Sequence, residues 1–268
     1  VPVVVTIHDL IPLIFPPYSG SLRVRAYTRL VATAARQAEV VITDSQTSAQ
    51  DIARLLGITG ERLRVIPLAA EPSYRPISAH EAQPVLARHG LDRPYVLYLG
   101  GFDMRKNVSL LIEAFGAIAS QTSVILAIAG RLPESDSAFA PDPRPIAARL
   151  HLGERVRFLG EVTEADKPAL YSGALAFAYP SLYEGFGLPV LEAISCGTPV
   201  VVGAGSSLEE VAGPGGLAVP PYRADELRSA LWRLIHEPSL RQELSAGGLE
   251  HARHYSWRQV ASQTLDAY

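Results

Sequence analysis

The sequence contains little cysteine and little net charge, and it lacks long apolar runs. Cys196 is the only cysteine among 268 residues, so no disulfide can form within the chain and a reducing compartment fits. The longest apolar runs, such as residues 123–130, are far too short to span a bilayer. A net charge of −3 argues against nucleic acid as the main partner, because neutralising phosphates requires a basic surface. We expect a cytoplasmic protein with no nucleic-acid partner.

The apolar content is high enough for a well-packed globular protein. Hydrophobic residues make up 48% of the chain and charged residues 19%, which argues against extensive disorder. A chain of this length forms two ordinary domains more often than one large domain. We therefore expect two hydrophobic cores.

Strands and helices alternate from the start of the chain. The pattern predicts strands at 1–7, 40–43 and 63–67, and helices at 21–38 and 45–56. This βαβαβ order forms a parallel sheet with right-handed crossovers. On the first helix the apolar side chains share one face, which we expect to point into the core, with the arginines solvated on the opposite face.

A proline-rich segment separates this unit from a second one. Residues 70–93 break the alternation, which indicates a linker with one short helix. Six further strands then alternate with helices, and they lie near residues 95–99, 124–129, 156–158, 175–178, 199–202 and 216–219. We expect them to form a complete doubly wound sheet, whereas the first unit has about half the strands of such a domain.

The strongest chemical signal is the segment 179–192. It follows a predicted parallel strand, and ligands bind at that end of strands in open α/β sheets. Gly185 and Gly187 permit close approach of the backbone to a ligand, and a proline then opens a helix. The free N–H groups at that helix start favour an anion such as a diphosphate. Glu184 and Glu192 can face the same cleft, where carboxylates accept hydrogen bonds from sugar hydroxyls.

A second glycine turn follows the first strand of the second sheet. Gly100 and Gly101 form this turn. Arg105 and Lys106 come next and can neutralise phosphates, the arginine through two parallel hydrogen bonds. Asn107 is placed to cap the following helix. The segment is not a P-loop, because the Gly-Lys-Ser/Thr sequence is absent.

Three other features favour structural interpretations. His251 and His254 lie one helical turn apart without a third metal ligand, so we expect a solvated face and no metal site. Ser207 with Glu210 has the spacing of a capping box. His8, at the end of the first strand, is by itself typical of a buried histidine bonded to backbone.

Together these segments resemble a large family of retaining GT-B glycosyltransferases. The family includes bacterial mannosyltransferases, glycogen synthases of the bacterial type and sucrose synthases. The resemblance covers essentially the whole chain, through Thr6-Ile-His8, Thr43-Asp-Ser45, the Arg105-Lys106-Asn107 turn, the Glu184…Glu192 block and Ser256-Trp257. Many members carry arginine where this chain has Gly101, and Arg105 can take over that role. The implied fold is α/β of GT-B type, with two Rossmann-like doubly wound parallel-sheet domains facing a cleft.

The resemblance also implies functional residues, position by position. It implies catalytic roles for Lys106 at the donor diphosphate, for Glu184 at the donor sugar, and for His8, which reaches that sugar from the other domain. The further donor-binding positions are Gly100, Gly101, Arg105, Val162 near the base, Gly185, Phe186, Gly187 and Leu188 near the distal phosphate, and Glu192 at the ribose.

The resemblance divides the chain into three parts. Residues 1–72 are expected to be the second half of the acceptor-side domain, with its upstream half missing. Residues 73–250 are expected to be the complete donor-binding domain, and 251–268 a helix that crosses back to the first domain. We expect such a chain to bind a nucleoside diphosphate yet to transfer little sugar by itself, because the first sheet would have one open edge.

The implied reaction is retaining transfer of a hexose from a nucleotide diphosphate sugar to a glycan or lipid-linked acceptor, with weak peripheral contact at the inner face of the membrane. The overall likeness favours mannose from GDP-mannose, and UDP-glucose or a deoxysugar donor is the alternative. We expect no cofactor and no metal, because no Asp-x-Asp is placed to hold a divalent cation and the cationic side chains can replace it. Two other functions fit: a non-catalytic nucleotide-sugar-binding relative or subunit, and a GT-B UDP-sugar epimerase.

Overall fold

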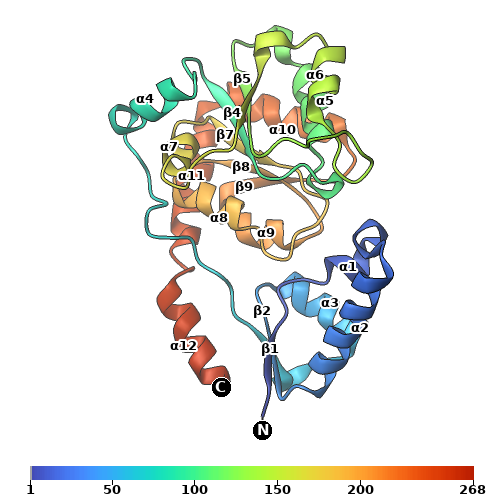
Figure 1. Cartoon of the computed structure of the whole chain (residues 1–268). Helices are drawn as coiled ribbons and strands as arrows, with labels where there is room; N and C mark the ends of the chain where they lie inside the picture. The colour runs from blue at the N-terminus through green and yellow to red at the C-terminus, as the bar shows by residue number, and fades with distance from the viewer. Residues whose placement is uncertain (1) are drawn as a thin grey trace.

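The computed structural model describes residues 2–268 and contains two separate sheets (Figure 1). The first sheet has the order β1-β2-β3, with strands Val4–Thr6, Val40–Thr43 and Leu63–Val65. The second has the order β6-β5-β4-β7-β8-β9, where β4 is Tyr95–Leu99, β5 Ile125–Ala129, β6 Val156–Gly160, β7 Ala176–Tyr179, β8 Val200–Gly203 and β9 Gly216–Val219. Every pair of neighbouring strands is parallel. The predicted α/β class with two parallel sheets is confirmed.

Helices connect the strands as the alternation predicts. We call residues 2–66 the first lobe and residues 79–252 the second lobe. The helices of the first lobe are α1 (Ile11–Ile14), α2 (Leu22–Gln37) and α3 (Gln46–Leu56). Those of the second lobe are α4 (Ala79–Arg88), α5 (Val108–Gly116), α6 (Pro143–Arg149), α7 (Lys167–Ser172), α8 (Leu188–Ser195), α9 (Ser207–Ala212), α10 (Ala224–His236) and α11 (Pro238–Ala252), and α12 (Trp257–Ala267) follows them.

The strand order of the second sheet fixes where a ligand can bind. The chain starts in the middle at β4, builds outward through β5 to β6, and then returns to the other side of β4 with β7. The carboxyl ends of β4 and β7 therefore form a crevice, because the connections leave them in opposite directions. Both strands are fully buried, so their ends are held by a rigid core. Both predicted glycine turns leave the sheet at this crevice.

Helix α2 does not bury its apolar face, and in this respect the sequence-based expectation is wrong. Leu22, Tyr27 and Leu30 are 78%, 67% and 68% exposed. The helix packs on the small core of the first lobe through Ala32 and Ala35, near its C-terminal end. In the part of the chain that the structure describes, the small core of the first lobe contacts the helix only at these two alanines, so the larger apolar residues at its start and middle are exposed to solvent. Within residues 2–268 no helix is both long and apolar enough to cross a membrane.

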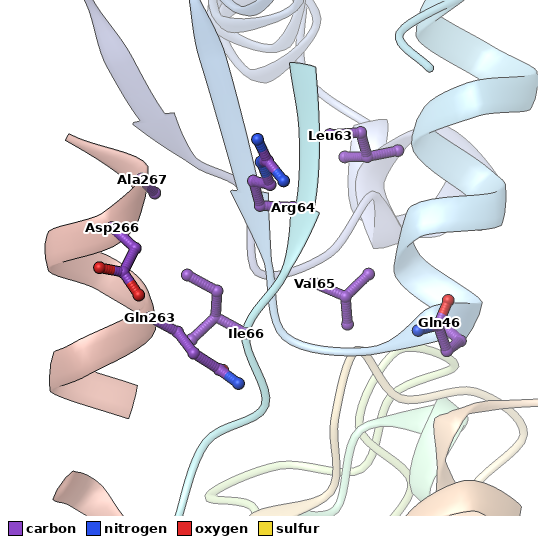
Figure 2. Close-up of a pocket in the computed structure, with 8 residues that line it drawn as sticks. All are labelled: Gln46, Leu63, Arg64, Val65, Ile66, Gln263, Asp266 and Ala267. Atoms are coloured by element: carbon purple, nitrogen blue, oxygen red, sulfur yellow. The ribbon is translucent and has the colours of Figure 1, made fainter. Parts of the chain in front are cut away.

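The C-terminal helix α12 lies beside the first sheet (Figure 1). A groove of about 550 Å³ runs between it and the edge strand β3, and Figure 2 shows the side chains of both elements that line the groove. These side chains are Gln46, Leu63, Arg64, Val65, Ile66, Gln263, Asp266 and Ala267. The chain thus passes from the second lobe back to the first, while the extent of the three predicted domains stays a proposal.

Candidate functional site

A cavity of about 410 Å³ opens between the lobes at the crevice between β4 and β7. It is lined by His8, Asp9, Asp44, Leu68, Gly100, Gly101, Lys106, Tyr179, Glu184, Gly185, Phe186, Gly187, Leu188 and Pro189. All the residues proposed from the sequence are in this set except Arg105, Val162 and Glu192. Residues more than 170 positions apart in the chain therefore meet at one site, and the first lobe contributes one wall.

Glu184 forms the charged centre of the cavity. Its carboxylate lies 2.7 Å from Lys106 Nζ and 2.6 Å from Arg105 Nη1, and all three side chains are nearly buried. Burial by itself would raise the pKa of the Glu184 carboxyl, but Lys106 and Arg105 together hold it below its ordinary value. The Lys106 ammonium also donates to the Tyr179 hydroxyl at 2.6 Å. In this structure Glu184 is therefore paired with Lys106, the cation that is predicted to bind the donor diphosphate.

Arg105 is held away from the cavity. It donates to the Tyr183 carbonyl at 2.6 Å as well as pairing with Glu184, and its guanidinium lies 5.7 Å from the centre of the Tyr18 ring. Tyr18, from the first lobe, donates in turn to Asp103. These contacts use the guanidinium to fix the loop that carries Glu184. They favour a positioning role for Arg105 rather than the predicted contact with phosphate.

The loop before α8 presents backbone donors to the cavity. Gly187 has φ +104°, in the region that favours glycine, and it is the N-cap of α8. The N–H groups of Gly185, Phe186, Gly187 and Leu188 donate to no protein acceptor within residues 2–268. Successive free N–H groups at a helix start form an anion site. The local structure therefore agrees with the anion site expected from the glycine pattern.

His8 reaches the cavity from the end of β1. Its Nδ1 lies 2.6 Å from Asp44 Oδ2, and the Asp44 carboxyl is 4% exposed whereas the His8 ring is 68% exposed. Burial raises the pKa of Asp44, although His8 lowers it in part. The bond leaves Nε2 of His8 free, so Asp44 sets the direction of the ring. Sequence reasoning missed Asp44, although the Thr43-Asp-Ser45 motif contains it.

Glu192 and Val162 lie outside the cavity lining. Glu192 accepts a hydrogen bond of 3.0 Å from the buried Tyr171 hydroxyl, and burial raises the pKa of its carboxyl. Val162 follows β6 and packs against the core of the second lobe. The same loop carries Glu164, which accepts from the Tyr74 hydroxyl at 2.9 Å. Glu184 and Glu192 thus have separate hydrogen-bond partners, and the expectation that both face one cleft stays a prediction.

Two local predictions are corrected by the structure. Asn107 precedes α5 as expected, but its side chain makes no capping hydrogen bond there, because it adopts φ +57° and donates instead to the Pro180 carbonyl at 3.4 Å. Ser207 and Glu210 do not form a capping box, because Ser206 is the N-cap of α9. Both Ser207 and Glu210 bond elsewhere, as described below.

Comparison with known families agrees with this geometry. The family model described as "Glycosyl transferases group 1" matches residues 83–251, which is most of the chain and includes Lys106 and the Glu184 loop. A second model, "Glycosyltransferase Family 4", matches residues 1–74. The two matches meet near the linker between the lobes.

Individual proteins show the same likeness along the whole chain. The O-antigen chain mannosyltransferase B of Escherichia coli is 34% identical over 270 residues, which cover 99% of this chain and 69% of that protein. The sucrose-phosphate synthase of Thermosynechococcus elongatus superposes with a TM-score of 0.83 at 28% identity, over 98% of this chain and 66% of that one. Anabaena HepE, solved in complex with UDP and glucose, superposes with a TM-score of 0.84 at 23% identity, over 99% and 70%. The fold is therefore GT-B, and the chain belongs to the group 1 glycosyl transferases.

Proposed function

We propose that the cavity binds a nucleotide diphosphate sugar for transfer of a hexose to a glycan or lipid-linked acceptor. The observation that carries this proposal is the convergence of Lys106, Glu184 and the free N–H groups before α8 on one cavity. A diphosphate would replace Glu184 as the partner of Lys106, and the released carboxylate would accept from sugar hydroxyls. The name of the E. coli relative favours mannose as the sugar.

We propose a retaining reaction without a metal. The bond between the anomeric carbon and the diphosphate breaks, and the acceptor oxygen bonds to the same face of that carbon. The acceptor proton passes to the leaving phosphate oxygen, so charge and atoms balance. The departing diphosphate is stabilised by the Lys106 ammonium and the start of α8, which are fixed before the reaction begins. Transfer with retained configuration therefore needs no nucleophile from the protein.

The donor preference and reaction class can be tested with the chain itself. We expect thermal-shift and calorimetric titrations to show binding of one nucleoside diphosphate, with GDP favoured over UDP, and slow release of that nucleotide from its sugar conjugate. Binding without any hydrolysis or transfer would favour the non-catalytic relative. A change in the sugar without release of the nucleotide would favour an epimerase. A chain that binds no nucleoside diphosphate would refute the proposal.

The metal-free proposal makes a separate prediction. Because Lys106 and backbone N–H groups supply the positive charge, EDTA should leave nucleotide binding and donor turnover within about twofold of the untreated values. The measurement compares initial rates before and after chelation, followed by addition of Mg²⁺ or Mn²⁺. Activity that is lost with EDTA and restored by either cation would contradict it.

We further propose that α2 makes the peripheral contact with an anionic membrane. Its exposed Leu22, Tyr27 and Leu30 lie on the same helix as the exposed Arg25 and Arg29. Apolar side chains that insert beside cations fit the interface of an anionic bilayer. Each cation near such a surface contributes about 1 kcal/mol.

This contact can be measured by co-sedimentation with vesicles. We expect binding to vesicles of phosphatidylcholine with phosphatidylglycerol, weak binding to phosphatidylcholine alone, and weaker binding as salt is raised. Leu30→Gln together with Arg29→Gln should reduce the bound fraction several-fold. Arg253→Gln, a change at the exposed arginine that directly follows α11, is the matched control. Equal binding by neutral vesicles, or no binding at all, would exclude the anionic surface as the partner of α2.

A further inference from the structure

Three buried serine side chains hold the carbonyl groups of the loop that carries Glu184. Ser207, at the start of α9, lies with its Oγ 2.8 Å from the Glu184 carbonyl oxygen and 2.9 Å from that of Phe186. Ser45 donates to the Gly185 carbonyl at 2.6 Å, and Ser48 lies 3.1 Å from the same oxygen. All three serines are at most 2% exposed. Three consecutive carbonyls are therefore fixed from outside the loop.

Fixing a carbonyl also fixes the N–H group that follows it. In a trans peptide the C=O and the next N–H lie in one plane and point in opposite directions. A serine on the Gly185 carbonyl thus sets the direction of the Phe186 N–H. The single Ser207 proton is shared between the Glu184 and Phe186 carbonyls and restrains the N–H groups that follow them. The N–H groups before α8 point away from the serines because their carbonyls point toward them.

The serines come from different lobes. Ser207 belongs to the second lobe, as does the loop itself, whereas Ser45 and Ser48 stand at the start of α3 in the first lobe. The first lobe approaches Gly185 so closely that a Cβ there would lie 2.6 Å from the His8 carbonyl oxygen and 2.7 Å from Asp9 Cβ. The Gly185 peptide is therefore anchored only while the lobes are in contact.

A second contact holds α3 in this position. The Glu210 carboxylate, from α9 in the second lobe, accepts from the backbone N–H groups of Gln46 at 3.2 Å and Thr47 at 3.4 Å. It thereby caps the N-terminus of α3 across the interface between the lobes. The helix that carries Ser45 and Ser48 is thus docked through its own free N–H groups.

We propose that Ser45 and Ser48 are positioning residues, which make the anion site at α8 depend on contact between the lobes. They do not line the cavity. They orient the Gly185–Phe186 peptide so that its N–H faces the diphosphate, and separation of the lobes would release this peptide. The inference rests on the proposed binding of a nucleoside diphosphate in the cavity, and it adds that the first lobe completes the phosphate site without touching the phosphate.

The test compares two nucleotides that differ by one phosphate. For the base that the wild-type chain prefers, calorimetry gives the ratio of diphosphate to monophosphate affinity. We expect Ser45→Ala combined with Ser48→Ala to lower this ratio about tenfold, because one well-aligned hydrogen bond to a charged phosphate is lost. The affinity for the monophosphate should stay within about twofold of the wild-type value. If the serines served only to stabilise the fold, their replacement would weaken the binding of both nucleotides to the same extent.

Controls separate positioning from folding. Ser45 also caps α3, so Ser48→Ala alone, which leaves that cap in place, repeats the measurement if the double variant is unstable. Ser181→Ala is the matched control, because Ser181 is fully buried in the same segment and its Oγ has no hydrogen-bond partner within residues 2–268. An unchanged ratio in both serine variants would overturn the inference and leave the proposed function standing. Absence of nucleotide binding by the wild-type chain would overturn both.

Discussion

Replacing Lys106 with alanine is expected to weaken the binding of a nucleoside diphosphate by about 10- to 100-fold. Among the described residues, Lys106 is the only lysine or arginine that lines the cavity. A charge-assisted hydrogen bond contributes about 1.5–3 kcal/mol, which corresponds to this range of affinity. Arg105 is not expected to substitute, because it does not line the cavity and its Nη1 is bonded to Glu184 and to the Tyr183 carbonyl.

Calorimetry with the preferred nucleotide gives the measurement. The fold should survive the change, since Glu184 keeps Arg105 as its partner, and a thermal melt verifies this. Arg253→Ala removes an exposed cation directly after α11 and controls for net charge. Unchanged diphosphate affinity in Lys106→Ala would remove Lys106 from the site. It would also leave the free N–H groups before α8 as the whole of the anion site.

Glu184→Gln is expected to reduce turnover of the donor on the order of 100-fold while leaving the affinity for the free nucleotide equal to that of the wild type or higher. Turnover falls because the donor sugar loses the charged hydrogen-bond acceptor that Glu184 supplies in the cavity. Lys106 loses its competing carboxylate, which accounts for the preserved or increased affinity. Glu192→Gln should instead weaken the binding of the free nucleotide about tenfold, because its proposed partner is the ribose.

Replacing Glu184 should also lower the stability of the folded protein. Removing one partner of a buried ion pair costs about 3–5 kcal/mol, and Glu184 pairs with two cations. Because the folded-state pKa of Glu184 is lowered, its ionised form stabilises the fold above the ordinary value of 4.5, and this contribution is lost as the pH falls through the lowered value. Melting temperatures of the wild type and Glu184→Gln should therefore begin to converge as the pH falls below about 4.5, and converge fully only below the lowered pKa of Glu184. Equal losses of nucleotide affinity in both glutamate variants would contradict the assigned roles.

Much of the fold could be predicted because it depends on local patterns. The alternation of apolar runs with amphipathic segments predicted both parallel sheets, and the proline-rich segment predicted the linker between them. The glycines at 185 and 187 predicted the turn into α8 because few other residues accept its backbone conformation. These features depend on residues close together in the chain, so the sequence alone expresses them.

The predictions that failed depended on which partner each side chain finds. The apolar face of α2 has helical periodicity, but periodicity does not show whether a sheet is present to cover that face, and here Leu22 and Tyr27 are exposed. The spacing of Ser207 and Glu210 fits a capping box, but neither side chain forms one. The Ser207 hydroxyl donates to the Glu184 carbonyl, and the Glu210 carboxylate accepts from the first N–H groups of α3. Residues far apart in sequence decided both outcomes.

By itself the sequence determined the α/β class, the strand at each edge of the crevice and the residue types that form an anion site there, because these follow from periodicity, glycine conformation and the direction of parallel strands. Only the tertiary structure decided how the charges are shared. It paired both Lys106 and Arg105 with Glu184, and it gave Glu192 a different partner, the Tyr171 hydroxyl. It also brought Ser45 to the Gly185 carbonyl across 140 residues. Ion pairs and hydrogen bonds depend on distances of a few ångströms between side chains, and only packing sets these distances.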